Sequence, residues 1–121
     1  MKTKDFLNAY KKELTALISW ISSEEDKLDS CAQRLIQSLE EGGKLFLFGC
    51  GGSSADAQHI AAELIGRFKC ERMPLPAIAL TTNTSALTAL SNDYSFDIVF
   101  ARQVEALVEE KDIVIGISTS G

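Results

Sequence analysis

Three short apolar runs, separated by helical patterns, restrict the possible folds of this chain more than any other feature. They lie at residues 45–48, 77–80 and 113–117. Uninterrupted apolar runs of this length are typical of parallel strands that are buried on both faces. A helical pattern reaches from the first run to about Phe68, and further helices are indicated over residues 85–90 and 96–110. The apolar face of the first of these helices, expected to pack on the core, consists of Ala57, Ile60, Ala61, Leu64 and Phe68. The alternation predicts an α/β protein with a parallel sheet flanked by helices.

Two amphipathic helices are predicted ahead of the first run. Apolar residues spaced by three or four draw one stripe along the first helix: Phe6, Tyr10, Leu14, Leu17 and Ile21. Ser22 and Ser23, followed by acidic residues, indicate the start of the second helix, and Gly42 and Gly43 indicate its end. We therefore divide the chain into a helical segment over residues 1–43, expected to pack against another copy of the chain, and a sheet domain over residues 44–121.

Charge and cysteine content exclude several classes of protein. Twelve basic and 17 acidic residues give a formal net charge of −5, which argues against a nucleic-acid partner or an anionic membrane surface. No apolar run approaches the ~18 residues of a membrane-spanning helix. Three widely spaced cysteines without a CxxC pair favour a reducing compartment, so we expect a cytoplasmic protein.

The last residues, 118–121, follow directly on the third apolar run. A buried strand normally leads into a covering helix, and a parallel sheet of only three strands would have open edges. We therefore expect the sheet domain to be incomplete and the chain to belong to a longer protein.

The loop after the first run is rich in glycine and serine. Gly51 and Gly52 allow a tight turn and a close approach of the backbone to a ligand. Ser53 is expected to cap the following helix, with Asp56 completing a capping box, and free N–H groups there would attract an anion such as phosphate. Ser54 stands where a dinucleotide-binding loop needs glycine, and the lysine of a nucleoside-triphosphate loop is missing, so neither motif is present. A purely structural turn is the alternative.

The loop after the third run carries three consecutive hydroxyl side chains, Ser118, Thr119 and Ser120. Because the carboxyl ends of parallel strands meet at one edge of a sheet, we expect this loop beside residues 50–54. Hydroxyl and N–H groups together suit a phosphorylated ligand. A serine-rich connection without a ligand is the alternative.

His59 and Glu63 are four residues apart, so they project from one side of the helix that the glycine loop begins. A solvated surface pair is one interpretation. The other is that both side chains bind a divalent metal, or that Glu63 is a general base. Because a catalytic zinc usually has three protein ligands, the missing ligand must come from residues beyond Gly121 or from another subunit.

Five segments together resemble the bacterial phosphoheptose isomerases, which belong to the sugar isomerase (SIS) domain superfamily. The segments are residues 49–64, 66–68, 75–82, 92–94 and 116–121. The resemblance implies a flavodoxin-like or Rossmann-like three-layer sandwich, and a homotetramer that uses the N-terminal helices. It also implies an aldose–ketose isomerase, active in the full-length chain, that converts sedoheptulose 7-phosphate to D-glycero-D-manno-heptose 7-phosphate for the heptose of lipopolysaccharide.

The functional positions of that family match residues of this chain one by one. The match implies that His59 and Glu63 bind zinc and that Glu63 also transfers the proton, whereas the remaining zinc ligands lie beyond Gly121. Substrate contacts are implied for Glu63 and for a further set: Cys50, Gly51, Gly52, Ser53, Asn92, Asp93, Ser118, Thr119 and Ser120.

Four positions depart from the family pattern. Cys50 replaces an asparagine, Asn83 an aspartate, and Ser91 and Ser95 replace glycines. Cys50 removes an amide donor and acceptor from a position that faces substrate, and no neighbouring histidine favours a nucleophilic role. A non-catalytic relative that senses phosphosugars or binds a replication initiator is the alternative function. Glu63 favours the enzyme, because the initiator-binding relatives typically lack that carboxylate.

Overall fold

The computed structural model describes residues 2–121, which divide into two compact units after Arg34. The first unit holds helix α1 (Thr3–Ser23) and the beginning of helix α2 (Glu25–Glu40). The predicted break between the helices is confirmed, since the Glu24 N–H donates to the Ile21 carbonyl and ends α1. No residue of α1 is buried.

The second unit contains a parallel three-stranded sheet in the order β2–β1–β3. Its strands are β1 (Leu45–Gly49), β2 (Ala77–Ala79) and β3 (Ile113–Ile117). The predicted strands are confirmed, and in the pairing Leu45 lies opposite both Ala77 and Ile113. The prediction that β2 and β3 are buried on both faces is wrong: Ile78 of β2 is 41% exposed and Val114 of β3 is 38% exposed. Both are edge strands of the described sheet, and within the described residues α3 packs mainly on β1 and β2.

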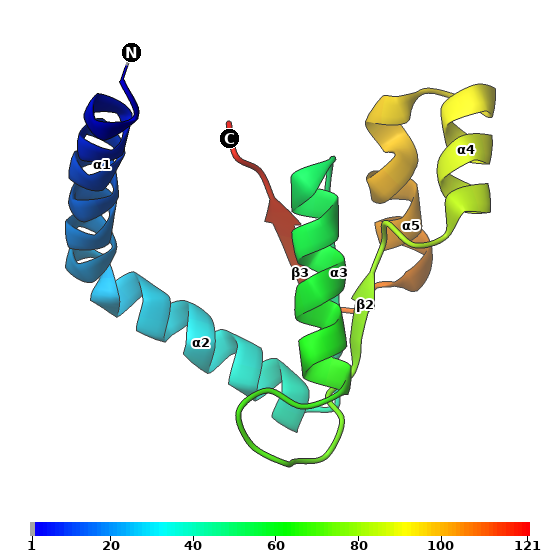
Figure 1. The fold of residues 1–121 in the computed structure, drawn as a ribbon. Helices are drawn as coiled ribbons and strands as arrows, with labels where there is room; N and C mark the ends of the chain where they lie inside the picture. Colours follow the sequence, from blue (N-terminus) through cyan, green and yellow to red (C-terminus); the bar gives the residue numbers. More distant parts are fainter. Residues whose placement is uncertain (1) are drawn as a thin grey trace. The chain divides into compact units, whose positions relative to one another are not determined.

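Helices cover both faces of the sheet. Helix α3 (Gly52–Ile65) runs along one face (Figure 1), where Ala57 and Ala61 pack with Leu45 and Leu47. Successive side chains of a strand point to opposite faces. Accordingly, Phe48 of β1 stacks at 4.7 Å on Phe100 of helix α5 (Val99–Leu107), which covers the other face. The predicted three-layer α/β sandwich is confirmed, and the strand order is that of the flavodoxin-like arrangement.

Two predicted boundaries between β2 and β3 are wrong. Residues 91–93, predicted as a turn, form the last turn of helix α4 (Thr84–Asp93), where the Ser91 hydroxyl donates to the Leu87 carbonyl at 2.6 Å. The helix predicted over residues 96–110 is instead a 3₁₀ turn, η1 (Phe96–Ile98), followed by α5, which ends at Leu107. None of the helices in residues 2–121 is both long and apolar enough to cross a membrane.

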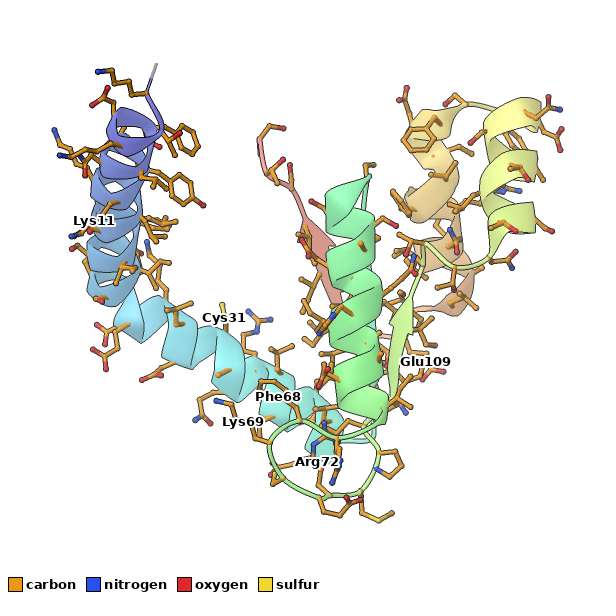
Figure 2. All side chains as sticks on the ribbon, in the orientation of Figure 1. Lys11, Cys31, Phe68, Lys69, Arg72 and Glu109 are labelled. Carbon is orange, nitrogen blue, oxygen red and sulfur yellow. The ribbon has the colours of Figure 1, made fainter. Side chains whose placement is uncertain are left out.

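A long loop joins α3 to β2 and carries Phe68, Lys69 and Arg72 (Figure 2). Lys69 has a positive φ of 60°, and the Cys70 N–H donates to the Phe68 carbonyl at 2.7 Å across it. The Leu75 N–H donates to the Leu64 carbonyl at 3.0 Å, which ties the end of this loop to the end of α3.

Candidate active site

The turn between β1 and α3 depends on glycine. Gly51 has φ 58° and ψ −121°, a conformation that side chains with a Cβ rarely adopt. The predicted cap at Ser53 is wrong: α3 begins at Gly52, Gly51 occupies the cap position, and no side chain caps the helix. Ser53 instead lies within the first turn and is 5% exposed. Its N–H donates to the Cys50 carbonyl, and the Ser54 N–H donates to the Gly51 carbonyl, both at 3.1 Å.

The glycine loop and the serine loop lie side by side, as predicted. Gly49 at the end of β1 pairs with Ile117 at the end of β3, so both loops leave the same edge of the sheet. Between them lies a cavity of about 400 Å³, here called the serine-loop pocket. It is lined by Phe48, Gly49, Cys50, Ser53, Phe96, Asp97, Phe100, Ile117, Ser118, Thr119 and Ser120. The adjacent ends of β1 and β3 are where a flavodoxin-like sheet binds its ligand.

Sequence reasoning missed one wall of this pocket. The rings of Phe48, Phe96 and Phe100 form it, with the ring centres of Phe96 and Phe100 6.3 Å apart in an edge-to-face arrangement, and Asp97 lines the same pocket. The spacing of four residues between Phe96 and Phe100 puts both rings on one face of a helix. That spacing is the signal in the sequence that could have revealed the wall.

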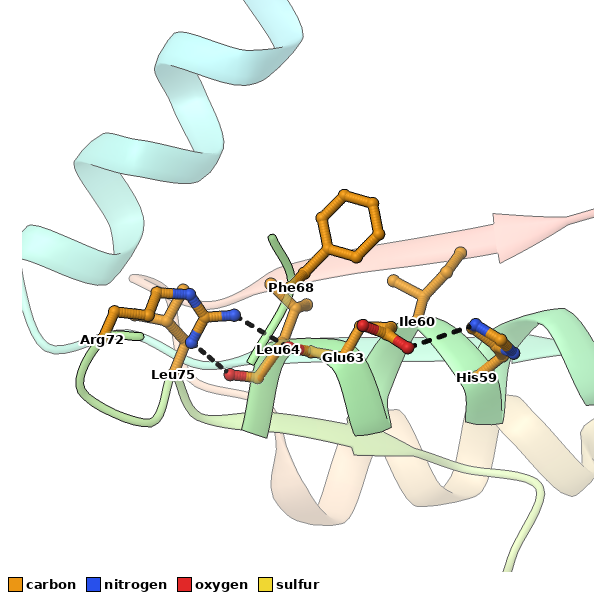
Figure 3. A pocket seen from close by; sticks show the side chains of 7 residues that line it. All are labelled: His59, Ile60, Glu63, Leu64, Phe68, Arg72 and Leu75. Carbon is orange, nitrogen blue, oxygen red and sulfur yellow. Dashed lines mark hydrogen bonds and ion pairs between the residues drawn. The ribbon is translucent and has the colours of Figure 1, made fainter. Parts of the chain in front are cut away.

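His59 and Glu63 line a second cavity of about 450 Å³, here called the helix-face pocket (Figure 3). The other lining residues are Ile60, Leu64, Phe68, Arg72 and Leu75. His59 Nε2 lies 3.4 Å from Glu63 Oε1, and the side chains are 75% and 38% exposed. Ile60 and Phe68, expected on the core side of α3, are 41% and 58% exposed, so that prediction is wrong and both belong to this pocket.

The described residues supply some, but not all, of the ligands that a metal site needs. Within residues 2–121, no group of three or more histidine, cysteine, aspartate or glutamate side chains could hold a metal ion. His59 and Glu63, one helical turn apart, are close enough to bind one ion together. An imidazole and a carboxylate are suitable zinc ligands, and a catalytic zinc needs a third.

The remaining predicted substrate contacts lie outside both pockets. Asn92 and Asp93 are exposed at the end of α4, where the Asn92 amide donates to Asp93 Oδ1 at 3.1 Å. Gly51 and Gly52 border the serine-loop pocket in the chain without lining it, and a Cβ on either would meet nothing within 4 Å.

Known proteins similar to this chain include phosphoheptose isomerases. A phosphoheptose isomerase of Geobacter sulfurreducens is 54% identical over 118 residues, which are 98% of this chain and 57% of that protein. A phosphoheptose isomerase of Aquifex aeolicus is 53% identical over 112 residues, which are 93% of this chain and 59% of that protein. The chain thus spans little more than half the length of these relatives.

Two solved structures have the same fold. A phosphoheptose isomerase from Neisseria gonorrhoeae superimposes with a TM-score of 0.86 at 42% identity, covering 98% of this chain and 61% of that one. A phosphoheptose isomerase from Francisella tularensis gives a TM-score of 0.90 at 38% identity, with coverages of 98% and 63%. The family model described as the SIS domain matches residues 9–121, and the chain therefore belongs to the SIS-domain family.

Proposed function

We propose that this chain is the first part of an aldose–ketose isomerase that converts sedoheptulose 7-phosphate to D-glycero-D-manno-heptose 7-phosphate, for the heptose of lipopolysaccharide. The observation that carries the proposal is the identity of more than 50% to phosphoheptose isomerases along nearly the whole chain. The two pockets supply what such a reaction needs: hydroxyl groups for a phosphate and a carboxylate for proton transfer.

The serine-loop pocket is the proposed phosphate site. Ser53, Ser118, Thr119 and Ser120 bring four hydroxyl groups to one cavity, and hydroxyl donors suit the acceptor oxygens of a phosphate. Binding energy from the phosphate orients the sugar without taking part in the chemistry. Cys50 lines the same pocket and is the proposed point at which this chain differs from its relatives in substrate contact.

Glu63 is the proposed base. Isomerisation removes a proton beside the carbonyl and returns it to the neighbouring carbon through a cis-enediol, and one carboxylate above both carbons can carry that proton. Ten residues separate Ser53 from Glu63 on α3, about 15 Å along the axis, and helical side chains lean back toward the N-terminus. This separation suits a substrate whose phosphate and reacting carbons lie at opposite ends of a seven-carbon chain.

His59 and Glu63 are also the residues that would hold zinc, together with ligands from outside this chain. A bound zinc ion would polarise the substrate carbonyl and so favour loss of the neighbouring proton. We further propose that the full-length protein is cytoplasmic and a homotetramer. Helix α1, which has no buried residue, supports the association of copies.

Two substitutions in the full-length protein test this function. Glu63→Gln removes the base, so kcat for sedoheptulose 7-phosphate should fall by about 10²-fold or more. Ser120→Ala removes one of several phosphate contacts, so KM should rise with little change in kcat. The matched carboxylate control is Glu105→Gln on α5, outside both pockets, which should keep the parent rate.

Metal content must be measured for each variant. If Glu63→Gln retains its metal and turns over at the parent rate, Glu63 is not the base, and a non-catalytic phosphosugar-binding protein becomes the better interpretation.

A further inference from the structure

Arg72, in the loop between α3 and β2, binds the end of the helix that carries Glu63. Its Nη2 donates to the Glu63 carbonyl and its Nη1 to the Leu64 carbonyl, both at 2.8 Å (Figure 3). Nη1 also donates to the Met73 carbonyl at 3.1 Å. One guanidinium group therefore holds two consecutive peptide groups in the last turn of α3 and the loop that follows.

The end of α3 has few other means of satisfying its carbonyls. The last four carbonyl groups of a helix lack partners within the helix. The cap residue Gly66 has φ −82° and so does not form the left-handed turn that ends many helices, and the last turn of α3 contains no basic residue. Arg72 supplies from the loop a donor to the Glu63 carbonyl and a second donor to the Leu64 carbonyl, which also accepts the Leu75 N–H at 3.0 Å. It also supplies the positive charge that the negative end of the helix dipole favours.

Arginine suits this position better than lysine. Its planar guanidinium presents donors in a fixed fork, which can reach two neighbouring acceptors at once, whereas an ammonium is a single point on a flexible stem. The same side chain also lines the helix-face pocket with Glu63. Arg72 thus contacts the backbone of the proposed base from within the pocket in which that base would act.

We propose that Arg72 is a positioning residue for Glu63. By fixing the peptide groups of Glu63 and Leu64, it sets the direction in which the Glu63 carboxylate leaves the helix and keeps it beside His59. This inference rests on the proposed function, because it assigns Arg72 a role in the reaction only through Glu63.

Arg72→Met in the full-length protein removes the donors and keeps a long apolar stem. We expect kcat to fall about tenfold, because a small misplacement of a catalytic group is costly. KM for the sugar phosphate should stay within about twofold, because phosphate is bound at the other end of α3. Arg72→Lys keeps the charge and can reach one carbonyl, so it should recover part of the lost kcat. If Arg72→Met folds poorly, kcat of Arg72→Lys can be measured in its place.

Two controls separate positioning from charge and from stability. Lys69→Met removes a cation of the same loop whose ammonium lies 5.4 Å from the centre of the Phe68 ring, and it should keep the parent kcat. Ser38→Ala removes a hydrogen bond of 2.6 Å to the Lys111 carbonyl, far from α3 in sequence. It should lower the melting temperature without lowering kcat at a temperature well below the transition.

A double-mutant cycle gives the decisive measurement. If Arg72 acts through Glu63, Arg72→Met should cause no further loss of kcat in the Glu63→Gln background. If the losses of kcat caused by the two substitutions multiply in the double variant, the inference is wrong. It is also wrong if Arg72→Met has the parent kcat while Glu63→Gln is slow. In both cases the proposed function still stands. If Glu63→Gln turns over at the parent rate, both this inference and the proposed function are wrong.

Discussion

The carboxylate of Asp112 is the most strongly constrained charge in the described structure. Its side chain is fully buried and accepts the N–H groups of Lys44 and Glu109, each at 2.8 Å, with the Lys44 ammonium 3.3 Å away. Burial by itself would raise the pKa of this carboxyl group. The two backbone donors and the lysine outweigh burial and lower the pKa below its ordinary value. Asp112 thereby joins the start of β1 to the turn before β3.

This arrangement predicts a loss of stability in acid. The pKa is lower in the folded than in the unfolded chain, so the stabilisation is complete above the unfolded value of about 4 and disappears as pH falls through the folded value. Asp112→Asn should cost about 2 kcal/mol near pH 7, because an amide cannot accept from both donors equally well. Its melting temperature should fall less steeply below pH 4 than that of the parent.

Thermal unfolding of the full-length protein between pH 2 and pH 7 would measure both effects. Glu109→Gln is the control, since its carboxylate is 64% exposed and contributes little. Parallel melting curves for Asp112→Asn and the parent across the acid range would contradict the assignment.

At the level of elements, Gly49 is where β1, α3 and β3 meet most closely. A Cβ at this position would lie 2.7 Å from the Ser53 Cβ and 2.9 Å from the Ile117 carbonyl oxygen. Gly49→Ala should therefore destabilise the protein by about 1–3 kcal/mol, the usual cost of overpacking. At Gly52 a Cβ would meet nothing within 4 Å, so Gly52→Ala should leave stability unchanged. Denaturant unfolding of both variants compares their free energies of unfolding. Equal unfolding midpoints would show that β1, α3 and β3 can move apart to accept the Cβ with little loss of stability.

The elements themselves could be predicted from the sequence where one local pattern determines them. The central strand β1 is a continuous apolar run, and its side chains are buried by helices on both faces. Local patterns failed where a contact distant in sequence decides the outcome. Val114 looks like a core residue and is exposed, because burial of an edge strand depends on what lies beside it.

The same limit applies to the candidate site. The pairing of the two loops at one edge followed from strand direction alone and is confirmed. Arg72 was missed because its hydrogen bonds to the Glu63 and Leu64 carbonyls require the loop to fold back onto the end of α3. No periodic pattern in the sequence predicts that fold of the loop. The roles of His59, Glu63 and the serines stay predictions, since position on an element does not establish chemistry.

At the scale of the whole molecule, helix α1 carries more apolar surface than an isolated helix should expose. Its large apolar side chains are all 42–60% exposed: Phe6, Leu7, Tyr10, Leu14, Leu17, Ile18, Trp20 and Ile21. An apolar stripe of this length indicates a surface that another protein covers. The homotetramer proposed above makes a second copy of this chain the expected partner.

Placing charges on the stripe should therefore dissociate the full-length protein. The double variant Leu14→Glu/Leu17→Glu adds two negative charges to the interface, and burying an unpaired carboxylate is costly. Sedimentation velocity should show the parent as one oligomer and the variant as smaller species at the same concentration. Lys12→Glu changes the net charge by the same amount on the opposite side of α1, so it should leave the oligomer intact. A variant that sediments like the parent would mean that this stripe is not the contact between copies.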